Sequence, residues 1–391
     1  MRRRLGYLLL GATLAVAGWT AAPALSVDPY LPEAEDFEQR VPAVERVAGV
    51  TANLRAAGSA ADAHADEGPV SHRSGVIAAP KRFDLAGIAG ELRAYELRAR
   101  TAGGEWSDWV ETGDGNPVYF GEADELQLRT RGWRPSGRLH YVNVSGTTSL
   151  GDRILNGARK TINGAFISVA GTLLPSAEAE VPKPDMVKRG EWGANRSSGG
   201  CKPRRKASYG KVRAAVVHHT VTANAYSKAE APGIVLGICR FHRNGNGWDD
   251  IGYNALTDRF GTIYVGRAGG IGKPVIGAQA QGFNWQTTGM AVLGTHTSEP
   301  IRKLARRAFG RFFAWKLRHG KPIGSKVWLE SAGGPLARVP KGKKIQVKRV
   351  IGHRRLNTTA CPGNEGRRQV KRIRRIANRI RTENETPAKT Q

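Results

Sequence analysis

The sequence predicts an α/β domain over residues 186–382, preceded by a small all-β, sandwich-like domain over residues 71–146. The apolar run 212–217 is typical of a buried central strand, and amphipathic stretches with helical periodicity follow it. Upstream, short runs of alternating apolar and polar residues are separated by turn signals. We therefore expect a mixed central sheet flanked by helices in the C-terminal half. A chain of 391 residues also exceeds what one hydrophobic core usually serves.

The first 26 residues have the features of an export signal. Three arginines precede the apolar run 5–19, and Ala22-Pro23-Ala24 offers the small-x-small pattern that a signal peptidase needs. The alternative is an uncleaved membrane anchor, because residues 5–25 are long enough to span a bilayer. The sequence therefore predicts a protein that is secreted or held in the cell wall.

Residues 27–70 are acidic and rich in alanine. We expect a mature N-terminal extension, partly helical around residues 41–54 and otherwise mobile.

The segment 71–146 alternates as β-strands do. Tyr95, Leu97 and Ala99, for example, are separated by charged residues, and glycine-rich turns divide the runs. Strands at this spacing suggest a small sandwich. Trp106, Trp109 and Trp133 suggest either a surface on which carbohydrate stacks or packing of the sandwich itself. We read residues 147–185 as a linker.

Helix signals recur in the C-terminal region. Ser227 and Glu230 form a capping box at the start of a helix that runs to Phe241. A second helix places Ile301, Leu304, Ala308, Phe312 and Trp315 on one face. The stretch 365–381 predicts a last helix docked on the sheet with a basic face, which also suits a polyanion. Residues 383–391 are expected to be a disordered tail.

Positive charge is concentrated in the C-terminal half. The whole chain carries a formal net charge of +28, and residues 183–391 hold 42 Lys and Arg against 11 Asp and Glu. A one-sided field of this size attracts a polyanion. Export favours anionic cell-wall polymers over nucleic acid, so we expect no specific nucleic-acid partner.

The three cysteines, Cys201, Cys239 and Cys361, indicate one disulfide and one cysteine with another role in an exported protein. Zinc is bound by imidazole nitrogen and thiolate sulfur, with three protein ligands in catalytic sites. His353 ends the short apolar strand 350–352, Cys361 follows eight residues later, and His218 ends the run 212–217. These three residues are the candidate ligands.

Five segments in this order resemble the peptidoglycan recognition proteins, a family homologous to the phage-lysozyme type of N-acetylmuramoyl-L-alanine amidase. They are EWGA (191–194), VVHHT (216–220), WDDIGYN (248–254), GTIYVGR (261–267) and the pair GH (352–353) with CPG (361–363). The chain is especially similar to secreted actinobacterial members, which the resemblance implies also carry a β-rich region before the amidase domain.

The resemblance implies zinc as the cofactor, with His218, His353 and Cys361 as its ligands. It also matches Tyr253 to the family's catalytic tyrosine and Thr359 to a position held by Thr or Lys in active members. The activity that the resemblance implies is hydrolysis of the amide between N-acetylmuramic acid and L-alanine. The expected partner is peptidoglycan, and the protein is expected to be a monomer. The alternative is a peptidoglycan-binding protein without activity.

With Cys361 assigned to the metal, Cys201 and Cys239 remain to pair as a disulfide or to stay as buried thiols. His219 is expected to point away from the site, because it neighbours a ligand on a strand. His242 and His296 are not expected to be ligands. Asp249 and Asp250 either assist catalysis or stabilise a turn.

One position departs from the family. Many relatives have His where this chain has Gln279, which cannot carry a proton. We therefore expect substrate contacts near Gln279 to differ from the usual pattern.

Overall fold

The computed structural model describes residues 33–47, 69–146 and 181–385. The described residues all fall within one compact unit. The predicted signal peptide and most of the predicted linker lie outside the described residues. Two sheets, one antiparallel and one mainly parallel, confirm the predicted fold class.

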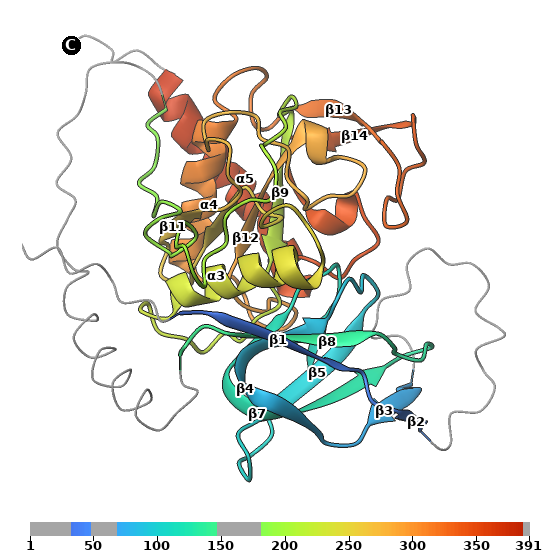
Figure 1. Cartoon of the computed structure of the whole chain (residues 1–391). Helices are drawn as coiled ribbons and strands as arrows, with labels where there is room; N and C mark the ends of the chain where they lie inside the picture. The colour runs from blue at the N-terminus through green and yellow to red at the C-terminus, as the bar shows by residue number, and fades with distance from the viewer. Residues whose placement is uncertain (1–32, 48–68, 147–180, 386–391) are drawn as a thin grey trace, which may run out of the picture. The chain divides into compact units, whose positions relative to one another are not determined.

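The N-terminal sheet is antiparallel, with the strand order β1-β8-β4-β7-β3-β2, and β5 pairs with β6 and β7. The long strands β4 and β7 curve (Figure 1), and their pairing shifts register between Ala78 and Leu85. The sandwich-like region is therefore one continuous sheet that encloses its own core. The strands are β1 (Glu35–Arg40), β2 (Val44–Arg46), β3 (His72–Ser74), β4 (Ile77–Ile88), β5 (Tyr95–Arg100), β6 (Val110–Thr112), β7 (Val118–Thr130) and β8 (Arg138–Asn143).

This sheet begins earlier than the sequence predicted. The expectation of a partly helical segment around residue 41 is wrong for the described residues, because β1 pairs with β8 and β2 pairs with β3. Phe37 of β1 stacks on Tyr141 of β8 with 5.1 Å between ring centroids. Partners about 100 residues away stabilise this strand, and local composition does not report them.

Tryptophan and arginine side chains alternate on the N-terminal sheet. The Arg98 guanidinium lies 4.8 Å from the ring centroid of Trp106 and 4.7 Å from that of Trp109. Arg100 covers Trp106 at 4.5 Å, and Arg129 covers Trp109 at 4.3 Å. These cation–π contacts occupy ring faces that a stacked sugar would need, so the contacts favour the packing role.

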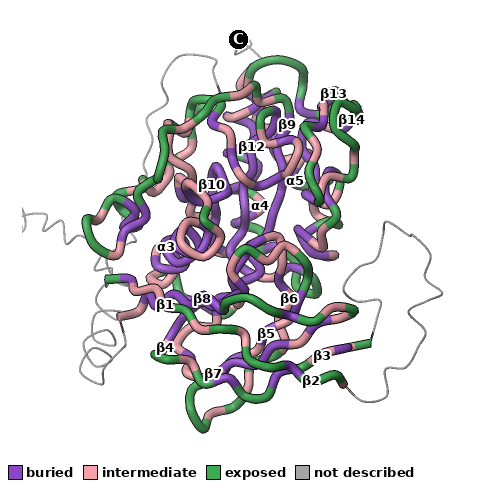
Figure 2. Tube along the Cα trace, turned by 45° about the vertical axis from the view of Figure 1, so that its right-hand side comes forward, coloured by how far each residue is buried: buried purple, intermediate pink, exposed green. Residues whose placement is uncertain are grey.

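The C-terminal sheet has the order β11-β10-β12-β9-β15. β10, β12, β9 and β15 run parallel to their neighbours, and β11 closes one edge antiparallel to β10. β9 and β12 are buried along their whole length, as the purple trace in Figure 2 shows. The strands are β9 (Ala214–His219), β10 (Ala255–Thr257), β11 (Ile263–Val265), β12 (Thr287–Val292) and β15 (Val350–Gly352), with a separate hairpin of β13 (Lys326–Glu330) and β14 (Lys344–Lys348).

Helices cover both faces of this sheet. α4 (Lys303–Lys316) and α5 (Asn364–Glu385) pack together on one face (Figure 1), in a core that includes Val217. α3 (Ala231–Arg240) packs against the other face. The predicted Ser227–Glu230 pair is present, since the Ser227 amide donates to a Glu230 carboxylate oxygen at 2.8 Å, but it lies in the turn before α3, which begins at Ala231 with Glu230 at its N-cap. Leu304, predicted on the apolar face of α4, is 50% exposed.

The N-terminal sheet and α3 share a single apolar core. Leu85 of β4 is fully buried in the same cluster as residues of α3. A Cβ at Gly237 would lie 2.4 Å from the Leu85 side chain, so any larger residue there would force Leu85 to shift. At the end of α3, Arg240 donates to the Asp36 carboxylate of β1 at 2.9 Å.

Cys201 and Cys239 form the predicted disulfide, with an S–S distance of 2.09 Å, and Cys361 is a buried free thiol. None of the helices in the described ranges combines the length and apolar character needed to cross a bilayer.

Truncating the core between the N-terminal sheet and α3 should destabilise the whole compact unit. We expect Leu85→Ala to lower the free energy of unfolding by about 2–5 kcal/mol, because it leaves a cavity. Leu304→Ala makes the same change at an exposed site and should cost less than about 0.5 kcal/mol. Chemical denaturation measures both values, and equal losses would contradict the shared core.

Removing the disulfide should also destabilise the protein. The bond closes a loop with a sequence separation of 38 residues. We expect the Cys201→Ala/Cys239→Ala variant to lose about 2–4 kcal/mol of unfolding free energy in guanidinium titrations. Reduced wild type should unfold at the same denaturant concentration as the variant. If oxidised and reduced wild type unfold at the same denaturant concentration, the disulfide does not contribute to the free energy of unfolding.

Candidate functional site

Three potential metal donors meet where two parallel strands end. β15 pairs with β9 so that Gly352 lies opposite Val217, and the next residues, His353 and His218, are therefore neighbours. Their ring centroids are 4.4 Å apart. Cys361 reaches the same point from the following loop, with its Sγ 3.5 Å from His218 Nδ1. One donor atom of each of the three side chains lies within 4.8 Å of the other two, and all three are buried.

Gln279 orients one of these rings. Its Oε1 accepts a hydrogen bond from His218 Nε2 at 2.5 Å, which leaves Nδ1 with a lone pair on the side of Cys361. Gln279 Nε2 in turn donates to Thr287 Oγ1 at 2.8 Å, which fixes the orientation of the amide. Gln279 departs from the family pattern. In the structure it is the hydrogen-bond partner of the His218 ring nitrogen that does not face Cys361.

Burial sets the protonation of the three donors. It lowers the pKa of His218 to about 3 and holds the pKa of His353 well below its ordinary value. Burial, together with the nearby Asp114 carboxylate, raises the pKa of the Cys361 thiol. Without metal the cluster is therefore two neutral imidazoles and a thiol, and binding a cation would release the thiol proton.

The cluster lines a pocket of about 210 Å³. Most of its lining residues come from the C-terminal domain, and three come from loops of the N-terminal sheet, namely Leu92, Asp114 and Asn116. The lining residues are Leu92, Asp114, Asn116, His218, His242, Trp248, Tyr253, Ala278, Gln279, Ala280, Gln281, Asn284, Leu336, His353, Asn357 and Cys361.

Tyr253 lies beside the cluster, with its ring centroid 5.3 Å from that of His218. Its hydroxyl donates to Asn116 Oδ1 at 2.7 Å. Burial raises the pKa of Tyr253 well above its ordinary value, and the nearby Cys361 and Asp114 raise it further. The phenol therefore keeps its proton and can act as a hydrogen-bond donor.

Thr359 is not among the residues that line the pocket. Its hydroxyl accepts the Cys361 amide at 3.0 Å and donates to the Asp114 carboxylate. In this structure the side chain therefore anchors the loop that carries Cys361.

The other polar candidates have contacts outside the cluster. His219 accepts the His296 amide at Nδ1, and His296 Nδ1 contacts the Glu299 carbonyl oxygen at 3.0 Å. Asp250 accepts hydrogen bonds from Arg189 at 3.1 Å and from the Ala268 amide at 2.8 Å, which favours the turn-stabilising role.

Asp114, Asn116 and the role of His242 were not predicted from the sequence. The Asp114-Gly115 pair gave only a turn signal, since nothing in the local sequence shows that this turn lies in a distant pocket. The Gly252 amide donates to His242 Nδ1 at 3.2 Å, so the His242 proton lies on Nε2, which donates to Asn116 at 3.3 Å.

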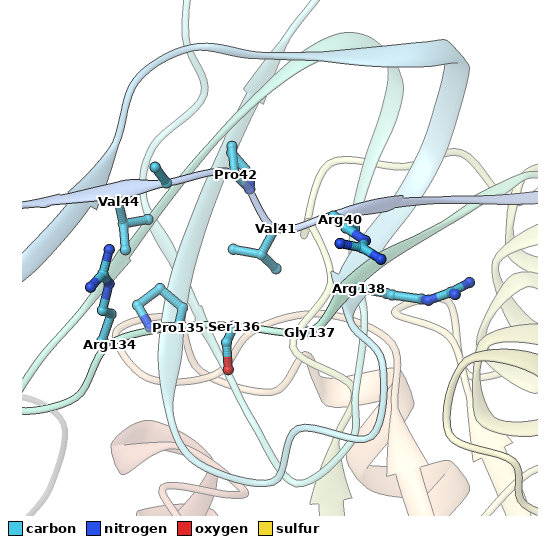
Figure 3. Close-up of a pocket in the computed structure, with 10 residues that line it drawn as sticks. Arg40, Val41, Pro42, Val44, Arg134, Pro135, Ser136, Gly137 and Arg138 are labelled. Atoms are coloured by element: carbon cyan, nitrogen blue, oxygen red, sulfur yellow. The ribbon is translucent and has the colours of Figure 1, made fainter.

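A second, larger hollow lies on the N-terminal sheet. It measures about 540 Å³ and is formed by residues 40–44 and 134–138 (Figure 3). Arg40, Arg134 and Arg138 are its charged residues, and Arg138 is paired with Glu38 at 2.8 Å. Because none of the residues lining it is a histidine, cysteine or carboxylate, the histidine–cysteine pocket is the candidate site.

Residues 208–364 match the family of N-acetylmuramoyl-L-alanine amidases. Peptidoglycan-recognition protein SC2 of Drosophila simulans is 27% identical over 179 residues, 46% of this chain and 80% of the relative. The N-acetylmuramoyl-L-alanine amidase of Sus scrofa is 29% identical over 189 residues, 48% of this chain and 27% of that protein. The solved structure of Drosophila PGRP-LB aligns at 23% identity and a TM-score of 0.37, covering 48% of this chain and 92% of that one.

Residues 208–364 thus match the N-acetylmuramoyl-L-alanine amidases, and the C-terminal half of the chain is also similar to peptidoglycan-recognition proteins. The special similarity to actinobacterial members stays a prediction.

The His218 ring should remain neutral through the physiological range. Because burial lowers its pKa to about 3, we expect the metal-free protein to hold the ring as the Nε2–H tautomer from pH 5 to pH 8. Nitrogen NMR of labelled histidine reports both tautomer and charge. A titration midpoint inside that range would contradict the burial argument, as would an Nδ1–H tautomer.

Proposed function

We propose that this protein is a zinc-dependent N-acetylmuramoyl-L-alanine amidase that cleaves peptidoglycan between N-acetylmuramic acid and L-alanine. The observation that carries the proposal is the buried cluster of His218, His353 and Cys361 lining a pocket, within the segment that matches the amidase family.

The donor set fits zinc. Two imidazoles and one thiolate match the ligand types of this ion, and three ligands leave a position open for water or substrate. A bound zinc ion supplies a Lewis acid that polarises the amide carbonyl and lowers the pKa of a coordinated water toward about 7. Gln279 would hold His218 in the tautomer that such a site requires.

The chain's own groups would bind and orient the substrate. Tyr253 keeps its proton, and rotation of its hydroxyl away from Asn116 would let it donate to the scissile carbonyl oxygen as negative charge develops. Thr359 would keep the Cys361 loop in place through the Cys361 amide. The small, mostly neutral pocket would limit the access of bulk water.

The setting of this activity would be the cell wall. The disulfide between Cys201 and Cys239 suits an oxidising compartment, and the N-terminal residues have the pattern of an export signal. The basic surface of the C-terminal half suits anionic wall polymers. The rival proposal is a peptidoglycan-binding protein without activity, and the complete histidine–cysteine cluster favours the enzyme.

Removing a ligand should abolish both zinc binding and hydrolysis. We expect wild type to hold about one zinc ion and to release stem peptides from purified peptidoglycan. Cys361→Ala and His353→Ala should bind zinc at least about 100-fold more weakly, because even outer-sphere changes cost 10–100-fold. Mass spectrometry of the metal and of the released peptides measures both effects.

The matched control is His319→Ala, which removes an exposed histidine outside the pocket and should leave zinc content and turnover intact. If wild type binds peptidoglycan but releases no peptide with zinc bound, the rival proposal holds.

A further inference from the structure

One turn of the N-terminal sheet reaches the pocket. The turn 113–116 (Gly113, Asp114, Gly115 and Asn116) connects β6 to β7. Asp114 and Gly115 both adopt left-handed backbone conformations, with φ of 56° and 75°. The Asp114 amide donates to the Leu92 carbonyl at 3.0 Å and the Gly115 amide to the Glu91 carbonyl at 3.1 Å. The backbone of the turn is therefore held by its own sheet.

The C-terminal domain holds the same turn from the other side. Asn246 donates to the Gly115 carbonyl at 2.6 Å and accepts the Gly90 amide at 3.1 Å. A Cβ at Gly115 would lie 2.7 Å from the Asn246 amide nitrogen and 3.1 Å from the Trp248 ring. Glycine is therefore required here both by the backbone conformation and by the space available.

The two side chains of the turn bind the two hydroxyls that the family resemblance assigns to catalysis. Asn116 Oδ1 accepts from Tyr253, and the Asp114 carboxylate accepts from Thr359. Asp114 is also the single carboxylate among the described residues that line the pocket, and its Oδ2 lies 3.9 Å from His353 Nδ1. It is not part of the group of three donors that lie within 4.8 Å of one another.

We propose that the turn 113–116 is a built-in part of the active site, in which Asn116 positions Tyr253 before substrate binds and Asp114 positions Thr359 and the Cys361 loop. The inference rests on the proposed amidase function. On this view the N-terminal sheet is no independent accessory domain, because the amidase domain alone lacks one wall of its own pocket. The shared core around Leu85 and the Arg240–Asp36 ion pair keep the turn in place.

The test uses single substitutions in the full-length, zinc-loaded protein. Asn116→Ala removes the acceptor of Tyr253. Asp114→Gly removes the carboxylate and suits the left-handed backbone, whereas Asp114→Asn keeps both an acceptor and that conformation. Asp108→Gly, at an exposed acid in the loop between β5 and β6, is the matched control.

We expect Asn116→Ala and Asp114→Gly to lower kcat on peptidoglycan about tenfold or more, with KM changed less than about threefold. Asp114→Asn should recover activity relative to Asp114→Gly, and Asp108→Gly should match wild type. Melting temperature should stay close to wild type in all four variants, and zinc content should do so in Asn116→Ala and Asp108→Gly. A kcat that stays at the wild-type value, or rises because the turn blocks the pocket, overturns the proposal.

A second measurement does not depend on catalysis. In the metal-free protein, the hydroxyl proton of Tyr253 should exchange slowly in proton NMR spectra, because it is buried and hydrogen-bonded. The signal should be lost in Asn116→Ala and kept in Asp108→Gly. If wild type releases no peptide, the amidase proposal fails, whereas a signal unaffected by Asn116→Ala overturns the role of the turn.

Discussion

The parallel pairing of β15 with β9 is the constraint on which the candidate site depends. It places Gly352 opposite Val217 and so brings His353 beside His218 at one edge of the sheet. A shift of one residue in β9 would turn His218 toward α4 and α5 and His219 toward the pocket. The apolar residues of β9 prevent this shift, because Val217 is buried in the core beneath those helices.

Prediction from the sequence worked where the signal is local or lies in a motif. The strand β9 and the helix α3 follow from apolar periodicity, and the family motifs indicated the three donor residues that the structure brings together. β1 was not predicted, because its stability comes from pairing with β8 about 100 residues away. Asn116 was missed for a similar reason, since its partner Tyr253 belongs to another domain. Contacts between residues far apart in the sequence produce no periodic pattern from which they could be predicted.

Gln279 shows how a residue can differ from its family and still suit the site. From the sequence it looked like the loss of a proton carrier. In the structure its carbonyl accepts from His218 while its amide nitrogen donates to Thr287, whose own hydroxyl donates to the Phe283 carbonyl. This series of hydrogen bonds permits one orientation of the Gln279 amide and therefore one tautomer of the His218 ring.

The close approach at Gly237 has a consequence for how such proteins diversify. A core shared across a domain boundary links the two sequences, since a larger residue at position 237 of α3 requires Leu85 of β4 to shift or to be replaced by a smaller one. An amidase domain recombined with an unrelated partner would expose the apolar face of α3 to water. We therefore expect the N-terminal sheet and the C-terminal domain to be inherited together. Substitutions on α3 and β4 should then occur in pairs, and neither domain should be exchanged alone.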